Sequence, residues 1–216
     1  MPEKKADLVV GLGYGDEGKA ECVDELAADH DEIVRYNGGP NAGHTSIHNG
    51  VKIASHQVPT GSLHKGKQMY SASDCVMHAP SLVDEMEEIK RAGIRDLQKR
   101  YRYSAQITVI QPHHELVDKA TMYTIGSTGK GVGPSYADKR RRVEGDREVG
   151  FSYGHLAAHP EHYFDMMKRN YKVELERVFS GVYNTPTEVL KDMQKKARKR
   201  GEKLKDANWP VDRYRG

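Results

Sequence analysis

The stretch LVVGLGYGDEGK, residues 8–19, decides the predicted fold. Its first part, Leu8 to Leu12, is a short apolar run bounded by glycine, which is typical of a buried strand. The glycine-rich part that follows opens an amphipathic stretch, 19–28, with apolar residues on one helical face. A strand, a glycine-rich loop and a helix in this order predict a phosphate-binding loop. Glycines let backbone N–H groups approach phosphate oxygens, and the helix N-terminus adds positive potential.

The spacing within this loop sharpens the prediction. Gly13, Gly18 and Lys19 match the pattern G-x-x-x-x-G-K, in which the lysine reaches the outer phosphates of a nucleotide. The serine or threonine that usually follows and binds magnesium is Ala20 here. Asp16 is therefore the candidate magnesium ligand, because carboxylate oxygens suit this hard cation. The alternative is a glycine-rich turn without a ligand.

The rest of the chain alternates short apolar runs with amphipathic stretches, which predicts an α/β fold with a mainly parallel central sheet and flanking helices. A hairpin is expected where Asn49-Gly50 supplies a turn between two alternating runs. Thr185 and Glu188 form a capping-box pattern at the start of a second clear helix, which Gly201 would end. The further predicted elements are strands at 33–36 and 107–110, a hairpin at 45–54, helices at 80–92 and 185–200, and a loop at 126–135.

Composition limits the function classes. The chain has 216 residues, with 34 Lys and Arg against 31 Asp and Glu, so its net charge of +3 does not argue for nucleic-acid binding. Residues 190–216 are basic, which is typical of a solvated helix face rather than a nucleic-acid or membrane arm. The two cysteines, Cys22 and Cys75, give no disulfide framework or metal-ligand spacing. No apolar run of about 18 residues is present. We expect a cytoplasmic protein that binds neither membrane nor nucleic acid.

Four motifs in order resemble the adenylosuccinate synthetase family. GDEGK at 15–19 is similar to that family's phosphate loop, and VRYNGGPNAGHT at 34–45 is similar to its segment ending in Asn-Ala-Gly-His-Thr. The asparagine-glycine hairpin followed by PTG at 59–61, and IGSTGKGVGP at 125–134, also resemble family motifs in the same order. The resemblance spans residues 7–145 and continues more weakly to 204. It implies a P-loop-like, GTPase-related fold and a purine-nucleotide ligase.

The resemblance also implies a two-step ligation of aspartate to IMP at the expense of GTP, giving adenylosuccinate. Asp16 would take the proton from N1 of the purine, and the 6-oxygen would attack the γ-phosphate. The amine of aspartate would then displace that phosphate. His44 would be the general acid that stabilises charge on the transferring phosphoryl group, in keeping with a histidine that donates a hydrogen bond into developing charge.

Further site residues are implied by the same resemblance. Mg²⁺ would be held by Asp16 and the carbonyl of Gly43. The phosphate of the purine nucleotide would contact Thr128, and Arg142 would serve a neighbouring subunit of a homodimer. The nucleotide-binding residues would be Gly15, Asp16, Glu17, Gly18, Lys19, Gly43, His44 and Thr45, and the substrate-binding residues Asn41, Ala42, Thr128 and Arg142.

The sequence departs from the family in two ways. Gly13 and Tyr14 replace a Gln-Trp pair, and Ala20 and Glu21 replace Gly-Lys, which leaves GTP and ATP open as phosphate donors. The chain also stops near the family's midpoint, so residues 1–216 correspond to an N-terminal portion without the arginine-rich loop that binds aspartate. We therefore keep two alternatives: a phage-type enzyme that joins aspartate to dGMP in making 2-aminoadenine, and an inactive truncated nucleotide-binding fragment.

Overall fold

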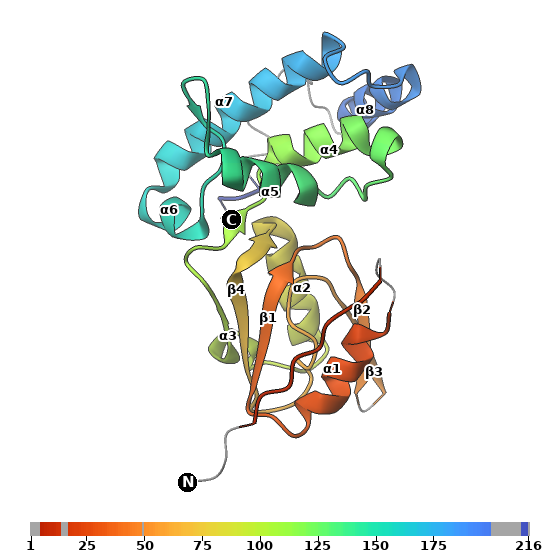
Figure 1. Ribbon diagram of the computed structural model, residues 1–216, viewed down its shortest axis with the longest axis vertical. Coiled ribbons are helices and arrows are strands. Elements are labelled where there is room, and N and C mark those ends of the chain that lie inside the picture. Colours follow the sequence, from red (N-terminus) through yellow and green to blue (C-terminus); the bar gives the residue numbers. More distant parts are fainter. Residues whose placement is uncertain (1–4, 14–16, 49, 200–212, 216) are drawn as a thin grey trace.

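The computed structural model describes residues 5–13, 17–48, 50–199 and 213–215. A parallel sheet with helices and a hairpin around it forms one part, and a group of helices forms the other, stacked on one end of the sheet (Figure 1). The strands are β1 (Glu32–Gly38), β2 (His44–His48), β3 (Val51–Ser55), β4 (Gln68–Met77), β5 (Tyr101–Tyr103), β6 (Thr108–Val109), β7 (Val143–Glu144) and β8 (Arg147–Glu148). The helices are α1 (Lys19–Ala27), α2 (Ala79–Arg91), α3 (Leu97–Arg100), α4 (Pro112–Ile125), α5 (Val132–Arg141), α6 (Tyr153–Ala158), α7 (Pro160–Phe179) and α8 (Thr187–Lys199).

The central sheet is parallel, as the sequence predicts. Strand β4 lies in the middle and pairs with β1, β5 and β6, all in the same direction. Met69, Val76 and Met77 of β4 are buried, as expected for a strand covered on both faces. Among the described residues, β1 pairs with β4 alone, so its other edge has no strand partner.

The predicted strand at Leu8 to Leu12 is wrong. These residues carry no strand hydrogen bonding, and Leu8, Val10 and Leu12 are exposed, with Leu12 at 98%. One contact ties the segment to the sheet, a hydrogen bond from the Tyr36 hydroxyl to the carbonyl of Val9. A strand exists only when a neighbour satisfies its backbone groups, and none of the described residues does so here. The glycine loop therefore follows an extended segment, not a paired strand.

Two other local predictions need correction. Residues 132–135 of the predicted loop 126–135 are the first turn of α5, and Pro134 is tolerated there because early helical positions need no N–H partner. The capping box at Thr185 does not form, since α8 begins at Thr187 and the buried Thr185 Oγ1 has no hydrogen-bond partner among the described residues. Gly201 lies outside the described residues.

The remaining local predictions are confirmed with small shifts. Helix α1, the β2–β3 hairpin and α2 lie within a residue or so of the expected ranges, although Asn49 of the hairpin turn lies outside the described residues. The predicted strand at 107–110 is the two-residue β6. Cys22 and Cys75 are both free.

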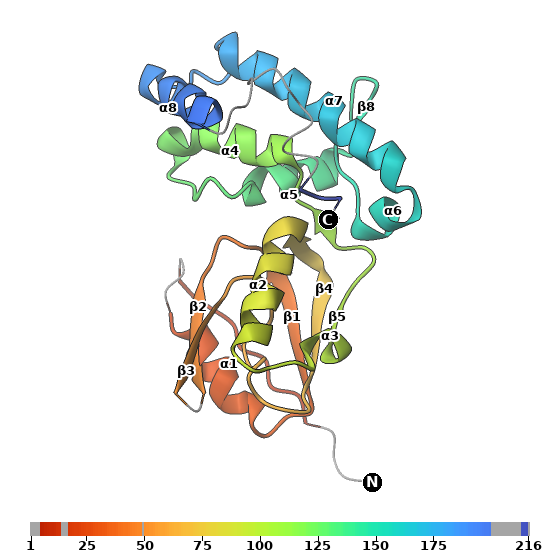
Figure 2. The same ribbon diagram turned by 180° about the vertical axis from the view of Figure 1, so that it is seen from behind.

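The helical part has a small apolar core of its own. Residues of α4 and α7 pack there, namely Leu116, Ala120, Leu175 and Val178, with Leu190 and Met193 of α8 against them. Seen from behind, α7 and α8 lie on the far side of α4 from the sheet (Figure 2). Within the described part of the chain, no helix combines the length and apolarity needed to cross a bilayer.

Candidate functional site

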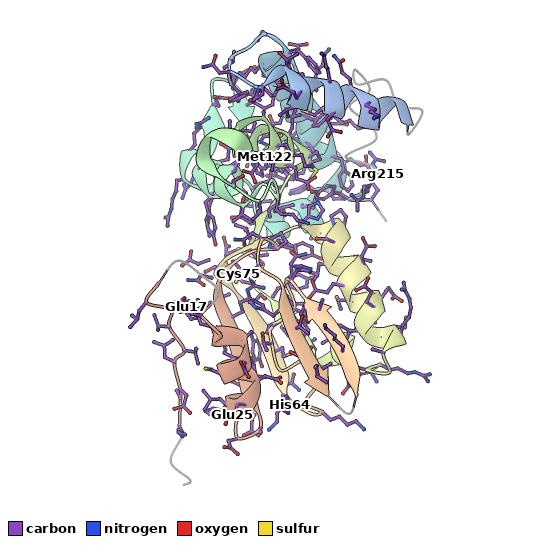
Figure 3. The ribbon with its side chains drawn as sticks, turned by 90° about the vertical axis from the view of Figure 1, so that its right-hand side faces the viewer. Glu17, Glu25, His64, Cys75, Met122 and Arg215 are labelled. Atoms are coloured by element: carbon purple, nitrogen blue, oxygen red, sulfur yellow. The ribbon has the colours of Figure 1, made fainter. Side chains whose placement is uncertain are left out.

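The first loop carries its own anion. The carboxylate of Glu17 accepts hydrogen bonds from the backbone N–H of Gly13 and from the ammonium of Lys19. The Lys19 hydrogen bond is the largest cause that lowers the pKa of Glu17, followed by the Gly13 N–H. Figure 3 shows Glu17 at the end of α1 nearer the helical part, with Glu25 at the opposite end. The backbone and lysine donors that the sequence assigns to phosphate thus already bind an anionic oxygen, so the donor set fits a phosphate group. Gly15 and Asp16 lie outside the described residues.

The second predicted segment meets the first in one pocket. This pocket has a volume of about 540 Å³, and Glu17, Lys19, Asn41, Ala42 and His44 are among the residues that line it. Gly18 is the N-cap of α1, with a left-handed φ of 73°. The pocket runs between α1, β1 and the extended N-terminal segment. Gly43 and Thr45 flank His44, and both are exposed.

His44 begins β2 and is half-buried. Burial is the largest cause that lowers its pKa, and the positive charges of Arg35, His56 and Lys19 lower it further. The ring is therefore neutral at neutral pH, and it can still donate an N–H hydrogen bond. Lys19 and His44 line the same pocket, so the positive charge of the first loop also acts on the His44 ring.

Arg35 holds the backbone around His44, a role that the sequence analysis missed. Its guanidinium donates to four carbonyls, those of Asn37 (3.2 Å), Gly39 (2.8 Å), His56 (2.5 Å) and Gln57 (3.2 Å). The rigid fork of donors suits this task. It joins the end of β1 to the turn after β3, so the Asn41–His44 segment is fixed from both sides. Its place in the motif VRYNGGPNAGHT, residues 34–45, was the sequence signal for this role.

Glu85 of α2 binds the backbone of the same turn after β3. Its buried carboxylate accepts the backbone N–H groups of His56 (3.0 Å), Gln57 (3.0 Å) and Val58 (2.9 Å). Burial raises the pKa of Glu85, although these N–H groups oppose that shift. His56 Nδ1 in turn donates to the Ala42 carbonyl at 3.0 Å. In the sequence, the signal for this role is that Glu85 falls on the same helical face as the apolar residues Leu82 and Ile89.

A second glycine loop, Gly126 to Gly131, precedes α5. Thr128 is exposed on it. Its inner side is tied to Asp118 of α4, a residue that is 3% exposed and that the sequence analysis also missed. Asp118 accepts from the Ser127 hydroxyl (2.5 Å) and from the Gly131 N–H (2.8 Å).

Helix α5 brings this second loop to the carboxyl end of the sheet. The Tyr136 hydroxyl accepts from the N–H of Gly38 (3.2 Å) and donates to the carbonyl of Asp74 (2.6 Å). A Cβ on Gly39 would lie 3.2 Å from a Val132 methyl group, so α5 begins directly against the segment that leads to His44. Figure 1 shows α5 above the ends of β1 and β4. Thr128 nevertheless does not line the pocket that holds Lys19 and His44.

Arg142 lies at the other end of α5, about 15 Å along the axis from Val132 at 1.5 Å per residue. Its φ of 63° with ψ of −50° is strained for a residue with a side chain. Its carbonyl accepts from Val149 N (2.8 Å) and Gly150 N (3.3 Å), while its side chain is exposed. The neighbouring Arg141 instead pairs with Glu144 at 2.9 Å. Arg140, Arg141 and Arg142 are all exposed, and Arg142 is the one of the three with a strained, left-handed backbone.

A buried cluster of His113, His114 and Asp138 has spacing that could hold a metal ion. Both Nε2 atoms lie near Asp138 Oδ2, at 3.0 Å and 3.2 Å. The Gln111 N–H donates to His114 Nδ1 at 2.9 Å, so the proton of that ring is on Nε2 and points at Asp138. A metal-bound Nε2 would need the opposite tautomer, in which Nδ1 donates. The hydrogen bonding thus assigns the cluster to joining α4 and α5, not to metal binding.

Within this cluster the pKa values of His113 and Asp138 are strongly shifted. Burial, and then the proximity of His114, lower the pKa of His113 to about 3. Burial alone would raise the pKa of Asp138, but the N–H groups of His113 and His114 outweigh burial and lower it well below its usual range. A neutral His113 therefore donates to an ionised Asp138 carboxylate.

A sequence model of the adenylosuccinate synthetase family matches residues 8–212. The chain belongs to the adenylosuccinate synthetase family. Adenylosuccinate synthetase 2 of Cupriavidus pinatubonensis is 43% identical over 164 residues, which are 76% of this chain and 36% of that protein. Adenylosuccinate synthetase of Acetivibrio thermocellus is 34% identical over 209 residues, 93% of this chain and 47% of that protein. This chain thus spans less than half the length of these family members.

Two solved structures share the fold. Fully ligated adenylosuccinate synthetase from Plasmodium falciparum superposes with a TM-score of 0.60 at 31% identity, covering 85% of this chain and 42% of that one. Cyanophage S-2L succinoaminodeoxyadenylate synthetase, bound to dGMP and to dATP as an energy donor, gives 0.55 at 24% identity, covering 69% and 41%. The second likeness concerns the fold alone. The α/β fold predicted for this adenylosuccinate synthetase family member is confirmed.

Proposed function

We propose that residues 1–216 are the N-terminal portion of an adenylosuccinate synthetase-like domain, a C–N bond-forming ligase that joins aspartate to IMP with GTP. The observation that carries this proposal is the pocket of about 540 Å³ in which Lys19, Asn41, Ala42 and His44 meet. The phosphate-binding loop and the proposed general acid come from different segments, yet they share one cavity. Phosphoryl transfer needs such placement, because most of its catalysis is positioning and charge stabilisation.

Each segment takes a separate task in the proposed reaction. The loop Gly15–Lys19 holds the triphosphate, with Lys19 exchanging Glu17 for a phosphate oxygen. Asp16 removes the N1 proton of IMP while the 6-oxygen bonds to the γ-phosphorus and GDP leaves. His44 donates a hydrogen bond to the transferring phosphoryl group. The aspartate amine then bonds to C6, its proton is lost, and inorganic phosphate leaves with the 6-oxygen.

We propose that Mg²⁺ is held by Asp16 and the carbonyl of Gly43. The oxygen donors suit this cation, and Gly43 lies beside the pocket-lining residues Ala42 and His44. When bound, the ion neutralises charge on the phosphates. Thr128 and the second loop would bind the 5′-phosphate of the nucleotide. Exposed Arg142 would reach the nucleotide site of a second copy in a homodimer, and we place the reaction in the cytoplasm.

A second candidate reaction is the ligation of aspartate to dGMP. The cyanophage structure that carries dGMP and dATP shares the fold, so both the nucleotide and the donor need testing. Asp16 favours IMP, because a carboxylate at N1 leaves little room for a 2-amino group. ATP remains an alternative donor because Ala20 and Glu21 stand after Lys19.

The test is a chimera in which this chain replaces the matching portion of the Acetivibrio thermocellus relative. We expect a succinyl nucleotide from IMP, GTP, Mg²⁺ and aspartate, and less product from dGMP or ATP. The 216 residues alone should give no product, because they hold no recognisable cluster of arginines for aspartate's two carboxylates. A folded chimera that binds GTP but ligates neither nucleotide would contradict the proposal, and a clear preference for dGMP would establish the alternative.

A further inference from the structure

The carboxylate of Asp118 holds the Gly126–Gly131 loop at both ends. Oδ1 accepts from the Ser127 hydroxyl at 2.5 Å, and Oδ2 accepts from the Gly131 N–H at 2.8 Å. Ser127 follows the start of the loop and Gly131 ends it as the N-cap of α5. One rigid side chain from α4 therefore fixes the distance between the two ends of the loop.

The contacts continue to the residues around Thr128. Ser127 Oγ, which donates to Asp118, also accepts from the N–H of Gly129 at 3.3 Å. Ser127 and Gly129 are the immediate neighbours of Thr128, so both are tied through one hydroxyl to Asp118. The loop also needs left-handed backbone at Gly129 (φ 68°) and Gly131 (φ 76°), and the internal hydrogen bonds to Ser127 and Asp118 stabilise this conformation.

Asp118 is not explained by charge pairing. It is buried, and among the described residues its carboxylate accepts hydrogen bonds from a hydroxyl and a backbone amide, not from a cation. Burying a carboxylate with neutral donors is costly, and it yields stronger hydrogen bonds than a neutral side chain of the same shape. Asp118 engages two loop donors from the inner side, which leaves the exposed side chains of Thr128 and Lys130 on the outer side.

We propose that Asp118 is a positioning residue that presents Thr128 and the second loop to the 5′-phosphate of the nucleotide. This inference rests on the proposed function, in which that loop binds the monophosphate. Asp118 does not touch the nucleotide. It acts through Ser127, Gly129 and Gly131, and its effect is specific for ligands that carry the phosphate.

The test compares IMP with inosine, which lacks the phosphate, as ligands of the 216-residue chain. Asp118→Asn keeps the shape and can still accept from Gly131 N–H, but its amide must donate to Ser127. Ser127→Ala removes the link to Gly129 and leaves the Gly131 bond intact. We expect each variant to lower IMP affinity about tenfold, the effect of losing one charge-assisted hydrogen bond, with inosine affinity unchanged. The control is Asp165→Asn, an exposed α7 carboxylate paired with Lys168, which should change neither affinity.

Amide hydrogen exchange separates positioning from folding. Asp118→Asn should speed exchange at Gly129 and Gly131 while the amides of β4 stay protected. If the wild-type chain prefers IMP over inosine and both variants keep that preference despite faster loop exchange, Asp118 supports only the fold and the inference is wrong. If the wild-type chain shows no preference for IMP, the loop does not bind the phosphate, and the inference fails together with this part of the proposed function.

Discussion

The two glycine loops share a backbone conformation and differ in what holds it. Gly18 caps α1 with φ 73° and ψ 13°, and Gly131 caps α5 with φ 76° and ψ 10°. A Cβ on Gly18 would meet nothing within 4 Å, whereas one on Gly131 would lie 2.9 Å from the backbone nitrogen of Glu115. The same local geometry is thus open in one loop and enclosed by α4 in the other.

The side chains that hold the two loops also differ, because those of the first loop are exposed and that of the second is buried. In the first loop, the Glu17 carboxylate accepts hydrogen bonds from the Gly13 N–H and the Lys19 ammonium, and both contacts are exposed. The second loop is fixed by the buried carboxylate of Asp118. Exposed local contacts exchange readily with a ligand, whereas buried ones hold a fixed geometry. We infer that the first loop rearranges when phosphate replaces Glu17, and that the second loop is preformed.

The largest expected effect concerns chemistry in the first loop. In the active chimera, Asp16→Asn should lower turnover by ~10²–10⁴, the usual loss of a general base, while GTP still binds. Thr128→Ala is the matched change in the second loop and should raise KM for IMP with little change in kcat, since it removes a binding contact. Steady-state kinetics with both variants measures the contrast. If Asp16→Asn kept near wild-type turnover, Asp16 would not be the general base, and the first loop would only bind the nucleotide.

His44→Ala should have the next largest effect. We expect turnover in the chimera to fall by roughly 10²–10³ with little change in nucleotide affinity, because the proposed hydrogen bond strengthens in the transition state. Burial and nearby positive charges keep the pKa of His44 low, so acidification from pH 8 to pH 7 should not change its charge. An effect confined to KM would show that His44 only binds substrate.

The glycine caps give a direct test of the comparison through stability. Gly131→Ala should lower the free energy of unfolding by the left-handed strain of about 1–2 kcal/mol plus about 1–3 kcal/mol for overpacking against α4. Gly18→Ala should lower it by the strain alone, about 1–2 kcal/mol. Urea unfolding of the 216-residue chain measures both. Equal losses would mean that the space around Gly131 adapts and that the second loop is not rigid.

The smallest effect lies beneath the second loop, where His113 and Asp138 join α4 to α5. The pKa of His113 is about 3 in the folded chain and about 6.5 in an unfolded one. Below pH 6.5 the unfolded chain therefore binds more protons, so the free energy of unfolding falls as pH falls. Between pH 6.5 and 4.5, above the range where Asp138 titrates, we expect His113→Gln to lose about 1 kcal/mol less per pH unit than wild type. Parallel curves would show that His113 titrates normally.

Local patterns were enough for much of the fold. Helix α1 and the β2–β3 hairpin depend on nearby glycines and apolar periodicity, so they could be predicted. The strand predicted at 8–12 is absent, because an apolar run becomes a strand only beside a pairing partner, which the sequence pattern does not identify. The first turn of α5, residues 132–135, falls in the predicted loop because Pro134 is also a turn residue, and its first-turn role depends on where the helix begins.

The candidate site shows the same division. Lys19 and His44 were identified from their motifs, and the pocket brings both together. Arg35, Glu85 and Asp118 were missed because their function is contact with backbone groups far along the chain. A carboxylate that accepts main-chain N–H groups has no fixed spacing from its partners. Such residues become visible only once the fold is known.

The edge of β1 that has no strand partner among the described residues makes the free energy of unfolding depend on which other molecules are in solution. Val34 and Tyr36 are exposed on this strand, and its outer side, which pairs with no strand among the described residues, offers backbone donors and acceptors. Any segment that pairs there binds the folded state alone, so the free energy of unfolding rises with the logarithm of that segment's concentration. The melting temperature measured for the 216 residues alone is therefore lower than the value with a segment paired to β1. It should increase as a peptide that can pair with this edge is titrated in.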